Sequence, residues 1–579
     1  MKKTFTIALF ALVAALALLS CNKSELDEQK TFANDKAFMT VVINDAGVTA
    51  ATKSTLADDG FEYDSGISIA SANFYFYDAD GNYETKASDT NIEVSSSVSG
   101  GVEGTTEAVV VLQDLAYITY PKYMVTVINK TDNFVEPKTG DTLEEILSVL
   151  SDPESTDGGI YDASDNFVMS TTSYDSGSTY YYVSEVSEEN FATEDTELED
   201  AVPVQIYVER LAVKVVVKFP EDALDNKTDS GLYEISFPEC TYEDGEMEVE
   251  ENSSFYVKVY GWRLNATAKH SYIVKNIKTS WAEEYLGFEW NDAENHRSYW
   301  GMSYNYGKGT TSSYPSKWSE IDKENDYLNY VSLGDVGSDD GITSFGEAAY
   351  CAENTNTAGT EGIIVSANSA AITSVLIKAQ LCTVNGTMIG NYVLYEGMLW
   401  QKDEFLEHLV DSWGFSECTV TTGDDDDDVE IYDCLELGTW GDGEVYPQLT
   451  DEAEDYTFML DDTDVTSKLK DAISDFKTNF DAHPVISFHK GLMYYNIPIQ
   501  HLNVTLNRDD NGTIIPAEGN YGVVRNHSYY ITIGSITTIG RGIHDPDEEI
   551  IPNEDLDNYY LSATVSVLPW KVVENTVDL

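Results

Sequence analysis

The sequence predicts an all-β protein of the β-sandwich type, and three observations favour this fold class. Apolar and polar residues alternate with a period of two along much of the chain, as they do in half-buried strands. The apolar runs are rich in Val, Ile, Tyr and Thr, and Gly, Asn and Asp lie between them. Helical periodicity is sparse. A length of 579 residues, at roughly 100–200 residues per domain, indicates more than one domain.

The first strand is expected at residues 38–43, where Met39, Val41 and Ile43 share one face. The second is expected at 72–77, and the turn that closes it begins at Asp78. Further strands are expected at 108–112, 123–128, 204–208, 211–219, 374–381, 392–395, 502–506, 528–533 and 561–567.

Two segments, 141–150 and 467–480, have apolar residues at helical spacing and are expected to be short helices over the sandwich edges. The acidic stretch 188–200 contains few large apolar residues and suggests a domain boundary. Residues 281–358 have little periodicity, so we expect them to form long insertions in the second domain.

The charge balance excludes several classes of partner. Lys and Arg number 33 and Asp and Glu number 102, which gives a net charge of −69. A nucleic-acid binder needs clustered basic residues for phosphate contacts, and docking on anionic lipid needs a polybasic patch. Disorder is also disfavoured, because 42% of the residues are hydrophobic and 12% are aromatic.

The N-terminus has the pattern of an export signal. Lys2 and Lys3 precede a short apolar run, which ends in Leu-Leu-Ser before Cys21. This ending resembles a bacterial lipobox, so residues 1–20 are expected to be a lipoprotein signal peptide and Cys21 to receive lipid. The alternative is an ordinary signal peptide with a chance cysteine. No later segment approaches 18 apolar residues, so membrane attachment is expected only through Cys21.

Five cysteines remain after Cys21, and an odd number in an exported chain argues against a disulfide framework. Cys418 and Cys434 flank the acidic run 424–428 and could form a disulfide that closes this loop. The alternative is two isolated buried thiols.

The sequence contains no motif that indicates an enzymatic function, and no cofactor or metal is expected. His408 is expected on a solvated polar stretch, and His527 in a buried hydrogen-bonded cluster. The acidic run 424–428 supplies oxygen ligands suited to Ca²⁺, but it lacks the spaced ligands and the glycine turn of a built site. A solvated loop is the favoured interpretation.

The C-terminus contains two extended segments separated by Pro569 and Trp570. In the second segment, 571–579, Val573, Val577 and Leu579 share a face with Asn575. Proline cannot donate to a strand ladder, so it is expected to mark where the chain leaves its own sheet. The alternative is a last edge strand that folds back.

The loop after the first strand contains a site for proteolysis. No arginine occurs before Arg210, so a trypsin-like protease would cut this region only after lysine, and Lys53 lies in the loop. Removal of the first strand would leave an apolar groove with unpaired backbone groups. The tail of another copy could fill this groove by strand addition.

At these positions the chain resembles the Bacteroidales fimbrillin family, the subunits of type V pili, and most closely its Mfa-type major subunits. The matching segments are the lipobox, 208–215, 521–527 and the ending around Pro569. The first strand, the stretch around Lys53 and residues 74–81 are similar to the start of the family's sequences.

The resemblance implies two transthyretin-like β-sandwich domains, 54–205 and 206–570, after a propeptide at 21–53 and before a donor-strand tail at 571–579. It also implies lipidation at Cys21, transport to the outer membrane, cleavage after Lys53 and assembly with other copies and other fimbrial subunits into an adhesive surface fibre. The donor strand would present Lys571, Val572, Val573, Asn575, Val577 and Leu579. The family commonly has Arg at the cleavage point, so Lys53 leaves the identity of the protease open.

Two alternatives to a polymerising subunit remain: a minor anchor or tip subunit of the same family, and a surface glycan-binding lipoprotein. A minor anchor subunit would stay uncleaved and lipid-bound, and a tip subunit would lack a free donor tail. A surface glycan-binding lipoprotein, which belongs to a different functional class, could use the aromatic residues dense in 285–306 to stack on sugars. In either case a host or bacterial surface receptor is a further expected partner.

Overall fold

The N-terminal strands form one eight-stranded sheet in the computed structural model. The model describes residues 36–45, 69–89, 105–113, 119–131, 134–143, 149–151, 159–160, 166–172, 183–193, 195–220, 224–243, 245–276, 301–306, 327–335, 338, 341–355, 372–422, 429–441, 443–479, 484–501, 507–508, 514–515, 521–551 and 561–569. The strand order is β3-β2-β5-β7-β9-β1-β4, with β8 beside β5. The bounds are β1 Lys36–Asp45, β2 Ala72–Tyr77, β3 Tyr83–Asp89, β4 Thr105–Gln113, β5 Tyr123–Ile128, β7 Met169–Thr172, β8 Ser184–Glu185 and β9 Val204–Arg210. The two ends of this order, β3 and β4, lie in contact, so the sheet curls around its core.

Both faces of β2 are buried, which explains its uninterrupted apolar sequence. Phe74 and Phe76 lie in the core inside the curled sheet, together with residues of β1 and β9. Tyr75 and Tyr77 lie on the opposite face, in a second core that also contains residues after β9. The N-terminal sheet therefore packs against the rest of the chain through the outer face of β2.

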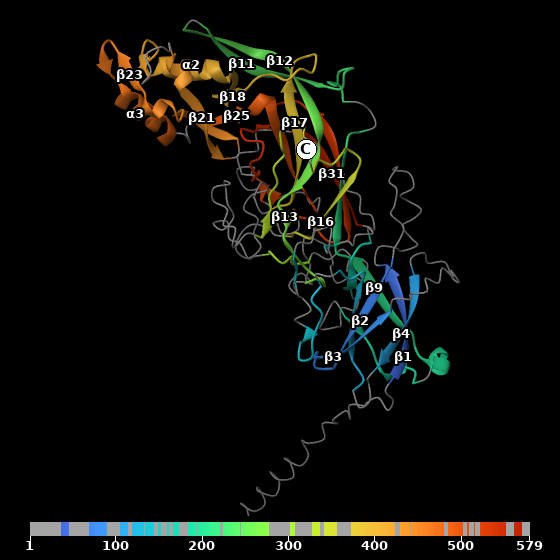
Figure 1. Cartoon of the computed structure of the whole chain (residues 1–579). Helices are drawn as coiled ribbons and strands as arrows, with labels where there is room; N and C mark the ends of the chain where they lie inside the picture. The colour runs from blue at the N-terminus through green and yellow to red at the C-terminus, as the bar shows by residue number, and fades with distance from the viewer. Residues whose placement is uncertain are drawn as a thin grey trace, which may run out of the picture.

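A sandwich of two sheets forms most of the C-terminal part (Figure 1). The smaller sheet has the order β16-β10-β29-β31, and the larger sheet has the order β21-β22-β25-β18-β19-β11-β12-β17-β26-β30. The smaller sheet comprises β10 Ala212–Lys218, β16 Ala348–Ala352, β29 His527–Ile536 and β31 Leu561–Pro569. The larger comprises β11 Tyr233–Glu243, β12 Glu246–Asn265, β17 Ser374–Cys382, β18 Tyr392–Tyr395, β19 Met398–Gln401, β21 Leu435–Gly441, β22 Glu444–Leu449, β25 Val485–Phe488, β26 Leu492–Pro498 and β30 Arg541–Gly542.

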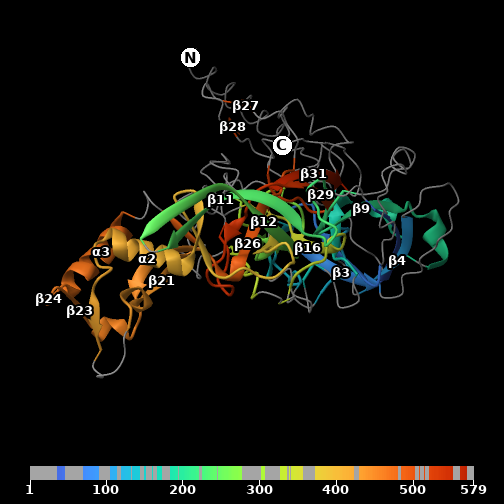
Figure 2. The ribbon, with the colours of Figure 1, turned by 90° about the horizontal axis from the view of Figure 1, so that it is seen from above.

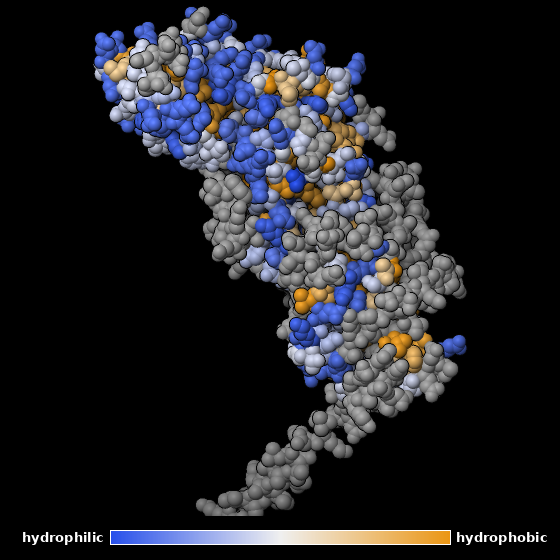
Figure 3. Space-filling model, in the orientation of Figure 1, coloured by the Kyte–Doolittle hydropathy of each residue, from blue (hydrophilic) through white to orange (hydrophobic). Residues whose placement is uncertain are grey.

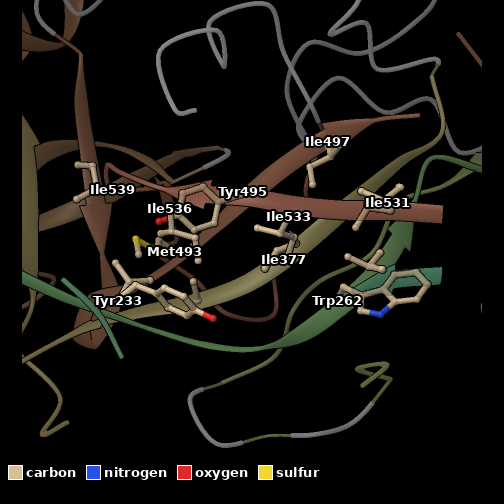
Figure 4. Close-up of a cluster of buried hydrophobic side chains, with 14 of the residues drawn as sticks. Tyr233, Trp262, Ile377, Met493, Tyr495, Ile497, Ile531, Ile533, Ile536 and Ile539 are labelled. Atoms are coloured by element: carbon tan, nitrogen blue, oxygen red, sulfur yellow. The ribbon is translucent and has the colours of Figure 1, made fainter. Parts of the chain in front are cut away.

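The core of this sandwich lies between the two sheets. Figure 4 shows Ile531 and Ile533 of β29 facing Trp262 of β12 and Ile377 of β17, and all four side chains are fully buried. Each buried aliphatic side chain of this size contributes about 1.5–3 kcal/mol by leaving water, as an upper estimate.

A second layer covers one end of the larger sheet. It contains α2 Lys402–Ser412, α3 Thr466–Thr478 and a small sheet of β20 Thr419–Thr421, β23 Thr457–Leu460 and β24 Thr463–Asp464. Figures 1 and 2 place this layer at the end of the molecule opposite β1–β4, and Figure 3 shows a largely hydrophilic surface over it. Its apolar side chains form a core with β18, β21 and β22.

The remaining elements are short. Three two-stranded sheets pair β13 Thr267–Ala268 with β15 Leu328–Asn329, β14 His270–Tyr272 with β6 Val149–Ser151, and β27 Asn507–Arg508 with β28 Ile514–Ile515. The 3-10 helices are η2 Glu188–Asn190, η3 Asp195–Asp200, η8 Ile431–Cys434, η9 Ala453–Asp455 and η11 His489–Gly491. Among the described residues, no helix has the length and apolar character needed to cross a membrane.

The all-β prediction, with sandwich packing and few helices, is confirmed. Every predicted strand within the described residues is present, and 502–506 lies outside them. The helix predicted at 467–480 is confirmed as α3. The prediction of a helix through 150 is wrong, because Thr142 forms a β-bridge with Asn82 and Val149–Ser151 is β6. Within 281–358, which we expected to be insertions, β16 is a strand of the sandwich itself.

Gly542, on β30 beside β25 and β26, provides a test of the packing between these strands. A Cβ atom on Gly542 would lie 2.3 Å from the carbonyl oxygen of Ser487, a backbone atom that cannot rotate away. Gly542→Ala should therefore lower the free energy of unfolding by about 1–3 kcal/mol in urea denaturation. The control is Gly390→Ala, whose added methyl group meets nothing within 4 Å and should not destabilise the protein. Equal stability of the two variants would contradict the described approach of β30 to β25.

Candidate assembly site

Strand β1 lies between β4 and β9 and pairs with both. It runs antiparallel to β4, from Lys36 opposite Gln113 to Asn44 opposite Thr105. It runs parallel to β9, and the pairing ends with Asp45 opposite Val208. Without β1, both neighbouring strands would present unpaired backbone groups to the same gap.

One face of β1 inserts into the core of the N-terminal sheet. Met39, Val41 and Ile43 are 0% exposed, as their alternation in the sequence predicts. They pack in one cluster with Phe74 and Ile206, which are equally buried. The strand thus supplies a row of core side chains at every second position, and its absence would open a long apolar groove.

The chain passes from the N-terminal sheet to the sandwich within a few residues. β9 ends at Arg210 and β10 begins at Ala212, so only Leu211 separates strands of two different sheets. The backbone N–H of Leu211 donates to the Val168 carbonyl at 3.0 Å, and Ala212 accepts from the N–H of Asn526 at 2.9 Å. Leu211 and Ala212 are fully buried in the second core, which Tyr75 and Tyr77 share. We call this region the junction.

Two ion pairs lie inside the junction. Glu209 Oε2 lies 2.9 Å from Lys275 Nζ, and Glu353 Oε2 lies 3.1 Å from Arg525 Nε. All four side chains are at most 2% exposed. The Arg525 guanidinium also donates to the carbonyls of Ile273 and Tyr272, at 3.1 and 2.8 Å. Burial raises the pKa of Glu209, although the charges of Lys275 and Arg525 partly oppose this effect.

Two buried histidines complete the polar part of the junction. His527 Nδ1 lies 2.8 Å from the Arg525 carbonyl, so this nitrogen carries the donated hydrogen. His501 Nδ1 lies 2.7 Å from the Tyr529 hydroxyl, which itself accepts the N–H of Val524. Burial lowers the pKa of His527 to about 3 and that of His501 well below its usual value. The buried hydrogen-bonded cluster predicted for His527 is confirmed.

The last described strand, β31, is at the edge of the smaller sheet. It pairs antiparallel with β29 from Leu561 opposite Ile536 to Pro569 opposite His527. β29 in turn runs parallel to β10, which follows directly from β9. The strand that leads toward the C-terminus is thus separated from the junction by only one neighbouring strand.

Several predicted site residues lie outside the described part of the chain. These are Cys21, Lys53, the acidic run 424–428 and the tail residues Lys571, Val572, Val573, Asn575, Val577 and Leu579. The turn at Asp78 is confirmed, because its Oδ1 accepts the N–H groups of Asp80 and Asn82 at 2.8 Å. No metal-binding group of His, Cys, Asp and Glu occurs among the residues that the structure describes.

The disulfide between Cys418 and Cys434 is not present, which corrects the predicted pairing. Both residues are free, buried thiols in the core beneath α2. The Cys434 thiol lies 3.7 Å from the carbonyl oxygen of Glu430, and burial raises the pKa of both thiols. The two cysteines therefore match the alternative interpretation as small apolar residues.

His408 and the aromatic residues of 285–306 were predicted to lie on the protein surface. His408 is half-buried, because its ring packs against Trp400 and Tyr242 while α2 buries its apolar face. The polar face predicted here is therefore only partly solvated. Within 285–306 the structure describes 301–306, where the Tyr304 ring lies against His270 and Tyr272. The Tyr304 ring therefore packs against other side chains of the protein, as expected for a structural rather than a sugar-stacking residue.

The charged residues of the junction were not predicted from the sequence. Glu209 and Arg210 interrupt an apolar run that forms β9 and β10, and this interruption was the available signal. A charged pair inside such a run indicates a buried partner, because an unpaired buried charge costs several kcal/mol. Lys275, the partner of Glu209, carries no comparable signal, because it lies far from Glu209 in the sequence. The same is true of Glu353 and its partner Arg525.

Part of the C-terminal region is similar to a known protein family. Residues 487–576 match the family described as the major fimbrial subunit protein type IV, fimbrillin, C-terminal. The match includes β29, β31 and the histidines of the junction, and it confirms the predicted resemblance to the fimbrillin family. No curated protein sequence matches the chain.

Two solved structures are among those similar to the chain. The fimbrillin FimA from Porphyromonas gingivalis W83 is 14% identical, with 93% of this chain and 98% of that chain covered and a TM-score of 0.35. The C-terminally truncated tip fimbrial protein Mfa3 from Porphyromonas gingivalis is 10% identical, with 92% and 99% covered and a TM-score of 0.34. The match to the fimbrillin C-terminal family covers residues 487–576.

Truncation of a core side chain in β1 tests the contribution of this strand. Ile43→Ala should lower the free energy of unfolding by about 2–5 kcal/mol, because Ile43 is fully buried among well-packed neighbours. Thr40→Ala, on the half-buried opposite face of the same strand, should cost less than about 1 kcal/mol. Urea denaturation of the unprocessed chain measures both. If Thr40→Ala lowered the free energy of unfolding as much as Ile43→Ala, the assignment of Ile43 to the core-facing side of β1 would be contradicted.

The buried histidines predict a dependence of stability on pH. The folded state keeps His501 and His527 neutral, whereas in the unfolded state both bind protons below about pH 6.5. Stability should therefore fall as the pH is lowered through this value, by up to about 1.4 kcal/mol per pH unit for each histidine. The raised pKa of Glu209 acts in the opposite direction.

Urea denaturation between about pH 7.5 and 5.5 measures this slope. His527→Gln keeps a hydrogen-bond donor but cannot titrate, so its slope should be smaller than that of the unmodified chain. Since Glu209 is present in both proteins, its contribution cancels in the difference. Identical slopes for the two proteins would exclude His527 as a source of the pH dependence.

Proposed function

We propose that this chain is a structural subunit of an adhesive surface fimbria, and the match of residues 487–576 to the fimbrillin C-terminal family supports this proposal. In this proposal the precursor reaches the outer membrane as a lipoprotein through Cys21. A trypsin-like protease removes the propeptide after Lys53, and the tail 571–579 of another copy replaces β1. The mature protein is then part of an extracellular fibre, together with other fimbrial subunits.

The position of β1 is the observation that carries this proposal. The strand lies between β4 and β9, its core-facing residues are fully buried, and it precedes the loop that contains Lys53. A cut in this loop separates β1 from the rest of the chain. Its withdrawal would expose two strand edges together with the apolar surface around Phe74 and Ile206.

The sequence of the tail suits such a groove. β1 contributes core residues at positions 39, 41 and 43, and the tail carries Val573, Val577 and Leu579 on a single face. Both patterns have the period of two that a strand requires. The tail follows β31, an edge strand, so the chain would not have to be drawn out of the middle of a sheet.

The energetics indicate which interactions must make the fibre durable. Burial of three or four aliphatic side chains contributes ~5–12 kcal/mol as an upper estimate. Association costs about 4–15 kcal/mol, which is comparable. A durable polymer therefore depends on ladder hydrogen bonds to β4 and β9 and on a high barrier to strand withdrawal.

The domain limits 54–205 and 206–570 are part of the same proposal. The passage between sheets at Leu211 lies a few residues after the predicted limit and supports a division in this region. The tight packing of the junction suggests that the two parts would move as one unit in a fibre.

Limited trypsin treatment of the purified, delipidated protein tests the proposed function. We expect an early cut after Lys53, followed by a ladder of multimers that resist denaturing gel electrophoresis. Two variants serve as controls. Lys53→Gln should block both the cut and the multimers, and deletion of 571–579 should allow the cut but abolish the multimers.

The other outcomes identify the alternatives. A cut without multimers in the full-length chain would indicate a tip or accessory subunit. Resistance at Lys53 would favour an uncleaved anchor or a glycan-binding lipoprotein. Binding of the monomer to a glycan array, unchanged by the tail deletion, would distinguish the latter from an anchor. Each of these results would overturn the assignment as a polymerising subunit.

A further inference from the structure

The ion pair between Glu209 and Lys275 has an unusual environment. Glu209 is on β9 of the N-terminal sheet, and Lys275 follows β14 in the C-terminal part. Their side chains are 1% and 2% exposed, and the distance from Oε2 to Nζ is 2.9 Å. This contact lacks the angles of a hydrogen bond, and no described residue forms a hydrogen bond with either Glu209 oxygen or with the Lys275 nitrogen.

Keeping both members of this buried pair charged has a large cost in desolvation free energy. Removal of a carboxylate and an ammonium from water costs several kcal/mol for each ion, and their attraction compensates only when further hydrogen bonds satisfy them. The pair between Glu353 and Arg525 meets this requirement, because Arg525 also donates to two carbonyls. The pair between Glu209 and Lys275 does not meet it within the described residues.

The geometry places a second carboxylate beside the same lysine. The position that a Cβ atom on Gly301 would take lies 2.9 Å from Lys275 Cγ and 3.2 Å from Glu353 Oε2. Glycine at this position therefore allows the Glu353 carboxylate and the Lys275 side chain to lie close together. Arg525 holds the Glu353 carboxylate, and the same carboxylate acts electrostatically on Glu209.

We propose that Glu209 and Lys275 condense to an intramolecular amide, a covalent cross-link between β9 and the segment that follows β14. Proton transfer from the ammonium to the carboxylate gives a neutral amine and a carboxylic acid. The lone pair of Lys275 Nζ then forms a bond to Cδ of Glu209, and the carbon–hydroxyl bond breaks. Glu353 takes a proton from the nitrogen and passes it to the departing hydroxyl group. One water molecule is released, and no other reactant is consumed.

Burial favours this condensation in two ways. The reacting atoms are held together by the fold, which replaces a bimolecular encounter by an intramolecular one. The product contains no charge at a site where charge is costly, whereas the starting pair contains two. The reaction requires only the folded chain and is independent of the proposed role in fimbriae.

The cross-link would change how the two parts of the molecule are connected. Among the described residues, the chain passes from the N-terminal sheet to the sandwich once, through Leu211. An amide between Glu209 and Lys275 would add a second covalent connection at the same place. If the protein is assembled through its groove and its tail, the tension between these sites passes through the junction, and the cross-link would oppose its separation.

Intact-mass spectrometry of the purified, unfolded protein tests the proposal. We expect a mass lower by one water, about 18 Da, than the mass calculated for the purified chain with its processed N-terminus, as the stated condensation requires. Tryptic mapping should show the peptides of Glu209 and Lys275 joined, and no cleavage after Lys275. The internal control is Lys378, another buried lysine, which donates to three backbone carbonyls and should remain uncoupled. A full mass with normal cleavage after Lys275 would overturn the proposal, whatever the behaviour of any variant.

Variants separate the two parts of the mechanism. Lys275→Gln should restore the full mass of its sequence, because it removes the nucleophile. Glu353→Gln retains both partners of the amide but removes the proton carrier, so the cross-linked fraction should fall at least tenfold at early times after refolding. An unchanged rate in this variant would contradict the role of Glu353. A mass deficit that persists in Lys275→Gln would show that another residue loses the water.

Discussion

The direct passage of the chain from β9 to β10 through Leu211 is the constraint on which the rest of the structure depends. β9 is the parallel partner of β1, so it forms one wall of the groove that β1 fills. β10 is the parallel partner of β29, which pairs with the last described strand. Because one residue separates the two strands, neither sheet can rotate freely about the connection. The buried core around Tyr75, Leu211 and Ala212 fixes their relative orientation.

The polar residues of the junction make this connection specific. An apolar contact alone tolerates sliding, whereas a buried ion pair or hydrogen bond is lost when the two surfaces shift by a few ångströms. Arg525 illustrates this property, because its guanidinium contacts Glu353 and two carbonyls on a separate segment. The buried histidines act similarly, since each is neutral and satisfied only in one arrangement.

The far end of the molecule is organised differently. There the larger sheet continues beyond the sandwich, and α2 and α3 cover the strands that the smaller sheet does not reach. The C-terminal part therefore has an apolar core beneath these helices in addition to the core between the two sheets. The hydrophilic surface of this end (Figure 3) agrees with the high net negative charge of the chain.

Alternation of apolar and polar residues is a local property with a period of two, so the strands could be predicted from the sequence. It identified β1 with its core face, the strand before Pro569, the helix α3 and the family of the C-terminal region. Tertiary contacts set the order of the strands, the parallel pairing of β1 with β9 and the burial of the apolar face of α2. The same holds for the pair of Glu209 with Lys275 and for Cys418 and Cys434, which are free thiols. These features depend on contacts between residues far apart along the chain, and the free energy of such contacts is set by packing and desolvation, which no local pattern records.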